Sequence, residues 1–257
     1  MVPGGRQNDG FGGLGGTYGF PIWLNNRGQV VGASNLPEDG TEHPFIWSKS
    51  NGMRDLGTLG GTFGHPDWVN DAGEVVGFAT IPGDQDGHGF LWRNGVMTDL
   101  GTVGTDPDSE GGSINSEGQI AGSSFSLAQG ANLHGFLWEN GGPLVDLNTL
   151  VLPGTSMTVT AALLINDRGE IACTGSSDVV PSEHPCILIP CDENHPGIEG
   201  CDYAFVDPAT VVEVRPAQIN EAPTSAGQVK LSPAEAMARY RSMMVKRHRG
   251  FRVSQPQ

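Results

Sequence analysis

The stretch HGFLWRNGVMTDLGT, from His88 to Thr102, recurs with few changes as HGFLWENGGPLVDLNT, from His134 to Thr149. A shorter copy of its beginning starts at His43 (HPFIW), and a weaker copy starts at His184 (HPCILI). In both long copies Asn-Gly separates two apolar runs, which is a strong signal for a β-hairpin. The repeated stretch therefore predicts the same hairpin at successive places along the chain.

A second motif precedes each hairpin and sets the length of the repeat. It reads LNNRGQVVG from Leu24, VNDAGEVVG from Val69, INSEGQIAG from Ile114 and INDRGEIAC from Ile165, in steps of 45, 45 and 51 residues. The Asn and Gly of N-x-x-G suit a type I turn followed by a left-handed residue, so this motif predicts another hairpin. Units of about 40–50 residues with four strands are typical of propeller blades. The sequence predicts an all-β fold, a β-propeller or propeller-like array of four-stranded antiparallel units.

The number of units predicts an incomplete ring or an open arc. Four units are present, the fourth is degraded, and GGLGGTYG near the N-terminus resembles the end of a further copy. Closed propellers usually contain about 4–8 blades, so four units are at the lower limit. In any such array Phe45, Phe90 and Phe136 must lie on equivalent strands.

The five tryptophans occupy two equivalent positions of the repeat. Trp23 and Trp68 lie two residues before the turn asparagine, and Trp47, Trp92 and Trp138 close the third strand. A large aromatic residue in each unit is what packing between neighbouring sheets requires. Packing is the preferred interpretation, and stacking of one indole on a carbohydrate is the alternative.

These motifs resemble the HAF-repeat family, extracellular repeat proteins of bacteria named for a His-Ala-Phe run. The resemblance covers roughly Gly12 to Asp202 and rests on IN..G.VVG, H.FLW and DLGTLGG, which follow one another in that order. The middle alanine of the run is Pro or Gly in every copy here. The resemblance implies an extracellular setting and a repeat β architecture, and it supplies no catalytic residue.

Charge is distributed unevenly along the 257 residues, whose net charge is −15. From Lys230 to the end, seven Lys/Arg and one acid give +6, whereas the other 229 residues hold seven Lys/Arg and 28 acids, or −21. Such an acidic body repels nucleic acid and anionic membranes, so neither is an expected partner.

The sequence contains no run of about 20 apolar residues, so no transmembrane segment is predicted. No signal peptide is recognised at the N-terminus, so two alternatives stay open: the protein is cytoplasmic, or the chain lacks its original N-terminus.

The composition divides the chain into three parts. Residues 1–207 form the repeat domain, 208–231 form a Pro-rich linker and 232–257 form a basic tail. In the tail, Ser232 suits an N-cap, Pro233 the first helical position and Glu235 a capping box. The sequence therefore predicts a short C-terminal helix, either docked weakly on the acidic body or not docked.

Long, acidic loops are the preferred place for a binding site, because function is best sought where the units differ. Alternating strand direction places the tight turns on one face of the array and the loops SNLPEDGTE, TIPGDQDGHG and GTDPDSEGG on the other. We call the latter the long-loop face. Its candidate ligand-binding residues are Glu38, Asp39, Glu42, Asp84, Asp86, Asp106, Asp108 and Glu110. Their carboxylates suit Ca²⁺ or a cationic ligand, while solvated loop acids are the plainer explanation; no other cofactor is expected.

The histidine that opens each third strand is assigned a structural role. His43, His88, His134 and His184 occupy one position of the repeat. We expect each to bond a backbone group or a carboxylate, because the symmetry of the array holds the four rings apart and ligation needs convergent donors. No metal is therefore assigned to these histidines.

The predicted function is a non-catalytic extracellular interaction scaffold that binds an unknown protein or glycan through the long-loop face. No G-x-S-x-G, H-E-x-x-H, P-loop or CxxC motif occurs in the chain. One alternative is a glycan-active enzyme, a hydrolase or lyase, which for glycoside hydrolysis needs two carboxylates about 5–9.5 Å apart. The other alternative is a purely structural repeat protein.

Four cysteines follow the third unit. Cys191 and Cys201 bound the polar loop CDENHPGIEGC, and we predict a disulfide between them. Cys173 and Cys186 are placed to face each other across a hairpin centred near Val179, either as a disulfide or as buried thiols. Paired cysteines fit an oxidising compartment.

Overall fold

The computed structural model describes residues 10–126, 133–151, 157–177, 183–192 and 194–197. These residues form four antiparallel sheets whose strands follow one another in chain order. The first sheet contains β1 (Gly19–Leu24), β2 (Val30–Asn35), β3 (Glu42–Ser48) and β4 (Gly52–Asp55); the second contains β5 (Gly64–Val69), β6 (Val75–Thr80), β7 (Gly87–Arg93) and β8 (Val96–Asp99). The third contains β9 (Asp108–Ile114), β10 (Ile120–Phe125), β11 (Leu133–Trp138) and β12 (Val145–Asp146), and a 3-10 turn, η1 (Leu147–Thr149), follows it. The fourth contains β13 (Met157–Ile165), β14 (Ile171–Ser177) and β15 (His184–Leu188).

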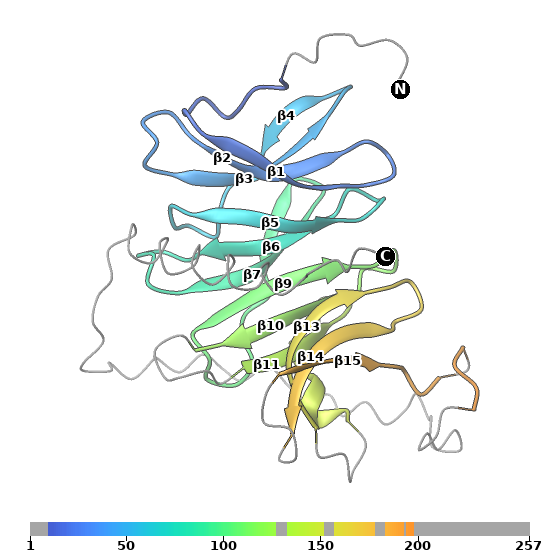
Figure 1. The fold of residues 1–257 in the computed structure, drawn as a ribbon. Helices are drawn as coiled ribbons and strands as arrows, with labels where there is room; N and C mark the ends of the chain where they lie inside the picture. Colours follow the sequence, from blue (N-terminus) through green and yellow to red (C-terminus); the bar gives the residue numbers. More distant parts are fainter. Residues whose placement is uncertain (1–9, 127–132, 152–156, 178–182, 193, 198–257) are drawn as a thin grey trace, which may run out of the picture.

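The sheets are stacked one after another, as Figure 1 shows, with β1–β4 at one end and β13–β15 at the other. The first strand of each sheet packs on the second and third strands of the sheet before it: β5 on β2 and β3, β9 on β6 and β7, and β13 on β10 and β11. Three apolar clusters fill the three boundaries between successive sheets. The predicted propeller-like array of four-stranded units is confirmed, in an open arrangement, with three strands described for the fourth unit.

The equivalent phenylalanines lie where the repeat places them. Phe45, Phe90 and Phe136 are fully buried on β3, β7 and β11, and each pairs across the sheet with a glycine. In the first sheet this glycine is Gly32, where an added Cβ would lie 2.7 Å from the ring of Phe45. At all three glycines an added Cβ would also collide with a backbone oxygen of the sheet's first strand, that of Phe20, His65 or Glu110, so this position requires glycine.

A disulfide replaces this glycine–phenylalanine pair in the fourth sheet. Cys173 on β14 and Cys186 on β15 occupy the same register position and are bonded to each other. The sequence left the state of these two cysteines open, and the structure settles it as a disulfide. Cys201 lies outside the described residues, so the bridge between Cys191 and Cys201 stays a prediction.

The turn asparagines join neighbouring sheets as well as closing their own turns. The side-chain amide of Asn25 donates to the backbone carbonyl of Asn70 (2.9 Å), that of Asn70 to Asn115 (3.0 Å), and that of Asn115 to Asn166 (3.1 Å). Each side-chain oxygen accepts backbone N–H groups of its own turn, as the motif predicts. The N-x-x-G motif thus sets both the hairpin and its alignment with the next sheet.

Four of the five tryptophans pack between sheets, as predicted, whereas Trp47 in the end sheet stacks on Phe11. Trp92 and Trp138 belong to the buried clusters, and Trp23 stacks on Trp68 with ring centroids 3.8 Å apart.

No helix within the described ranges has the length and apolar character needed to span a membrane. The predicted linker 208–231 and the predicted helix in 232–257 lie outside the described residues.

Candidate functional site

Two of the candidate loop acids, Asp39 and Asp84, hold their loops in place by accepting hydrogen bonds from threonines outside those loops. Asp39 accepts hydrogen bonds from the backbone N–H (2.7 Å) and hydroxyl (2.6 Å) of Thr17. Asp84 accepts the same pair of bonds from Thr62, at 2.6 and 3.1 Å, and a third from the hydroxyl of Thr80. Both aspartates have positive φ, which Asp tolerates better than most residues. Their equivalent geometry indicates a structural role in the repeat.

The acids of the third loop are buried. Asp106 pairs with the Nδ1 of His134 at 2.8 Å, and Asp108 accepts the backbone N–H of Gly87 at 3.0 Å. Asp108 and Glu110 belong to strand β9, although the sequence had placed them in a loop. Of the others, Glu38 is exposed in its loop, whereas Glu42 is buried at the start of β3.

Asp86 and Asp108 are candidate long-loop acids that the structure brings close enough to interact. Burial is the main cause that raises the pKa of Asp108 to about 6; Asp86 and Asp106 raise it further, while Gly87 and His88 act in the opposite direction. Burial also raises the pKa of Asp86. The pKa of His88 is raised by its hydrogen bond to Asp99 and by the surrounding carboxylates. Two carboxyls of this acidic group therefore have raised pKa values, and perturbed pKa values are common at functional sites.

Each histidine of the repeat was predicted to bond a backbone group or a carboxylate, and three of the four are seen to bond a carboxylate. His43 pairs with Asp55 at 2.8 Å, His88 with Asp99 at 2.9 Å, and His134 with Asp106. Asp55 and Asp99 also accept the backbone N–H two residues later, so each holds the loop that follows the fourth strand. The aspartate of DLG is thus a structural partner of the preceding histidine.

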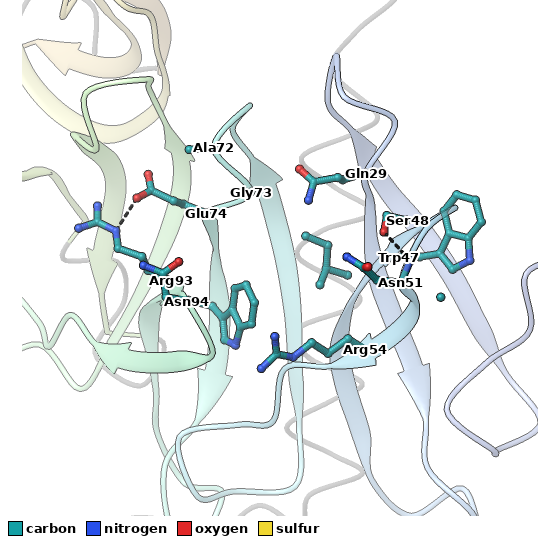
Figure 2. Close-up of a pocket in the computed structure, with 13 residues that line it drawn as sticks. Gln29, Trp47, Ser48, Asn51, Arg54, Ala72, Gly73, Glu74, Arg93 and Asn94 are labelled. Atoms are coloured by element: carbon teal, nitrogen blue, oxygen red, sulfur yellow. Dashed lines mark hydrogen bonds and ion pairs between the residues drawn. The ribbon is translucent and has the colours of Figure 1, made fainter.

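A groove of about 410 Å³ lies between the first and second sheets, at the edge formed by the tight turns. Figure 2 shows it between the strands of the two sheets. It is lined by Gln29, Ile46, Trp47, Ser48, Asn51, Gly52, Arg54, Ala72, Gly73, Glu74, Trp92, Arg93 and Asn94. The sequence motifs do not predict this groove, because they favour a binding site on the opposite, long-loop face.

Arg54 gives the groove its distinctive chemistry. Its guanidinium lies over the indole of Trp92, 4.9 Å from the ring centroid, which is cation–π geometry. Arg93 is ion-paired with Glu74, whereas Arg54 has no ion pair with any residue that the structure describes. Figure 2 shows Arg54 reaching from the first sheet into the space between the sheets.

The position of Arg54 is neutral in the second and third units. Arg54 pairs across its sheet with Ile46, and the same register position holds Thr98 in the second sheet and Val145 in the third. Among the described residues, a cation at this position therefore meets the repeated indole at the first boundary alone. The signal was present in the sequence as an arginine at a repeat position that is otherwise uncharged.

A second group of polar side chains lies between the second and third sheets. The Nε2 of His65 on β5 is 3.6 Å from a carboxylate oxygen of Asp67 and 3.5 Å from one of Glu110 on β9. All three donor atoms lie within 4.8 Å of one another, a spacing that suits a metal ion. Burial alone would lower the pKa of His65, but the two carboxylates outweigh it and raise the pKa to about 10.

No protein-family model matches the chain, and no curated protein matches it. Among solved structures, it is similar to TolB from Acinetobacter baumannii, with 14% identity and a TM-score of 0.40 over 66% of this chain and 43% of that one. It is also similar to an acylaminoacyl peptidase from Pyrococcus horikoshii, with 10% identity and a TM-score of 0.43 over 69% of this chain and 28% of that one. The chain spans less than half the length of either protein.

Proposed function

We propose that the protein is a non-catalytic extracellular binding scaffold that holds a carboxylate-bearing glycan in the groove between its first two sheets. The observation that carries this proposal is the guanidinium of Arg54 over Trp92, at a position that the second and third units leave uncharged. Guanidinium groups bind carboxylates through two parallel hydrogen bonds. A cation held on an indole is well placed to do so, since stacking leaves the N–H edge available.

The rest of the lining fits a polar ligand. Gln29 and Asn51 supply side-chain amides, and Ser48 supplies a hydroxyl, all at the rim of the groove. Trp47 is half-buried and already stacked on Phe11, with centroids 4.7 Å apart. Sugar recognition commonly combines such amides with aromatic faces, whereas the apolar side chains needed to enclose a hydrophobic ligand are few here.

The extracellular setting is part of the proposal. The Cys173–Cys186 disulfide supports it, because disulfides persist mainly in oxidising compartments. The resemblance of the repeat motifs to the HAF-repeat family points the same way. Binding of a protein through the long-loop face, as the sequence suggested, remains the competing version of this scaffold role.

The test is a glycan array with neutral and carboxylate-bearing oligosaccharides, followed by titration of the best binder. Arg54→Thr installs the residue that the second sheet has at this position and should weaken binding at least tenfold. Arg27→Ala is the matched control: it removes an exposed cation from the same edge and installs the residue that the second unit has there, Ala72. Equal affinity of Arg54→Thr and the wild type would exclude the groove, and selective binding of a peptide probe would favour a protein partner.

A glycan-active enzyme is the second candidate, favoured by the raised pKa of Asp108 beside Asp86. A general acid must hold its proton near neutral pH, and Asp108 approaches that condition. A hydrolysis assay run in parallel with the array, with and without Ca²⁺, tests this candidate. Turnover that is lost in Asp108→Asn and kept in Arg54→Thr would replace the scaffold role with catalysis. No signal in either assay would leave a structural repeat protein.

A further inference from the structure

The cluster of His65, Asp67 and Glu110 is distinct from the groove and departs from the repeat. Counting back five residues from each turn asparagine gives Phe20, His65, Glu110 and Ala161. His65 and Glu110 are therefore the same repeat position in two neighbouring sheets, and the flanking units fill that position with apolar side chains. The fold accepts Phe or Ala here, so the charged pair is not a requirement of the architecture.

Asp67 is a third departure at the same boundary. It lies three residues before its turn asparagine, where the other units have Ile22, Gly112 and Leu163. The register of β5 with β6 shifts between Pro66 and Trp68, so Asp67 occupies a β-bulge. Bulges redirect side chains and are common beside functional sites. The bulge belongs to the repeat, but a carboxylate on it belongs to the second sheet alone.

From this arrangement we propose that His65, Asp67 and Glu110 form a binding site for a divalent transition-metal ion of the Zn²⁺ type. One imidazole nitrogen and two carboxylate oxygens are donors that Zn²⁺ accepts at about 2.0–2.2 Å. Tetrahedral bonds of that length hold neighbouring donors about 3.3–3.6 Å apart. The observed separations from His65 Nε2, 3.5 and 3.6 Å, have this value.

Charge and burial favour the same occupant. The side chains of His65 and Glu110 are only 4% and 5% exposed, and that of Asp67 is 16% exposed. Two carboxylates bring two negative charges into this buried place, and a divalent ion beside a neutral imidazole cancels them. Buried charge is costly unless it is neutralised, so the ion lowers that cost. Ca²⁺ prefers all-oxygen sites, and the imidazole selects against it.

The experiment uses the full chain after treatment with EDTA. Titration calorimetry with ZnCl₂ should show one site that is absent with CaCl₂, and bound zinc should raise the melting temperature. His65→Phe and Glu110→Ala install residues that other units carry at this position and should each weaken Zn²⁺ binding at least tenfold. Glu117→Gln, a change at an exposed turn acid, should leave the affinity unchanged.

The wild type alone provides a second measurement if a variant does not fold. Sub-stoichiometric Co²⁺ should broaden the NMR resonances of the His65 imidazole before those of the other six histidines. Zinc binding of unchanged affinity in both folded variants, broadening that begins at another histidine, or no binding at millimolar ZnCl₂ would each overturn the assignment. The groove proposal is unaffected by any of these outcomes.

Discussion

Aliphatic side chains at equivalent positions of the repeat are buried in the centre of the array and exposed at its two ends. Leu24 and Val69 each precede a turn asparagine, yet Leu24 is 59% exposed and Val69 is 1% exposed. At the other end, Ile187 is 60% exposed, whereas Leu91, at the same register position in the second sheet, is 4% exposed. The repeat gives each unit two apolar faces, and the neighbouring sheet decides whether they are buried. Stability in such an array depends on boundaries between units as well as on the units themselves.

The strongest test of this comparison is a pair of alanine substitutions at one register position. Leu91→Ala should reduce the free energy of unfolding by about 2–5 kcal/mol, because it opens a cavity between the second and third sheets. Ile187→Ala should change it by less than about 0.5 kcal/mol, since this side chain is mostly in solvent. Urea denaturation followed by tryptophan fluorescence measures both. Equal losses would show that the end sheet is covered in solution.

The disulfide of the fourth sheet supplies a second test. Cys173 and Cys186 stand where the first three sheets pair glycine with phenylalanine, in an end sheet that packs on one face only among the described residues. Cys173→Ala combined with Cys186→Ala should cost about 2–3 kcal/mol, by analogy with other loops of similar length. Reducing agent should produce a larger loss in the wild type than in the double variant, in which only the predicted Cys191–Cys201 bridge is left to reduce. An unchanged melting temperature after reduction would mean that packing alone holds this hairpin.

Buried and exposed acids should respond to pH in opposite directions, and Asp108 is the buried case. Its pKa is about 6 in the folded protein, above the ordinary value of 3.8, so the folded state holds a proton that the unfolded state releases. Stability from this group is present below about pH 4 and is lost as the pH rises to about 6. Asp108→Asn should therefore stabilise the protein by about 1–3 kcal/mol at pH 7 and have little effect at pH 4. Parallel unfolding curves at the two pH values decide this, and a variant that is less stable at pH 7 would contradict it.

The repeat period, the hairpins and the bonding of His43 and His88 to a carboxylate could be predicted because each depends on residues close in sequence. Asn25 and Gly28 specify a turn by local geometry, whatever the rest of the chain does. The groove and the His65 cluster could not be derived in this way. Each depends on which residues of two sheets meet across a boundary, and that requires the stacking register. Aligning the units by position and searching for a change of charge, as at Arg54, would have found both.

The same limit explains why the long-loop acids were assigned to a ligand. Their number and their polar surroundings suggested a solvent-facing cluster. The partners that hold them are distant in sequence: Asp84 bonds Thr62, and Asp106 bonds His134. Carboxylates that accept backbone and hydroxyl donors in this way stabilise loops, a role that composition alone does not reveal.

The smallest expected effect is the loss of stability on substitution of two equivalent loop aspartates, Asp84 and Asp39. Asp84 accepts three hydrogen bonds in the half-buried loop that joins β6 and β7, whereas Asp39 makes its bonds to Thr17 in full exposure to solvent. Asn tolerates the positive φ of both positions, so Asp→Asn changes isolate the lost charge and acceptor. Asp84→Asn should cost about 1 kcal/mol at pH 7, and Asp39→Asn should cost less, because solvent competes for the same donors.

The hydrogen bonds from Thr17 lower the pKa of Asp39, so its contribution is present above pH 3.8 and lost as the pH falls further. The difference in melting temperature between Asp39→Asn and the wild type should thus disappear in acid; a larger loss for Asp39→Asn than for Asp84→Asn would mean that the exposed end of the array is held more tightly than its interior.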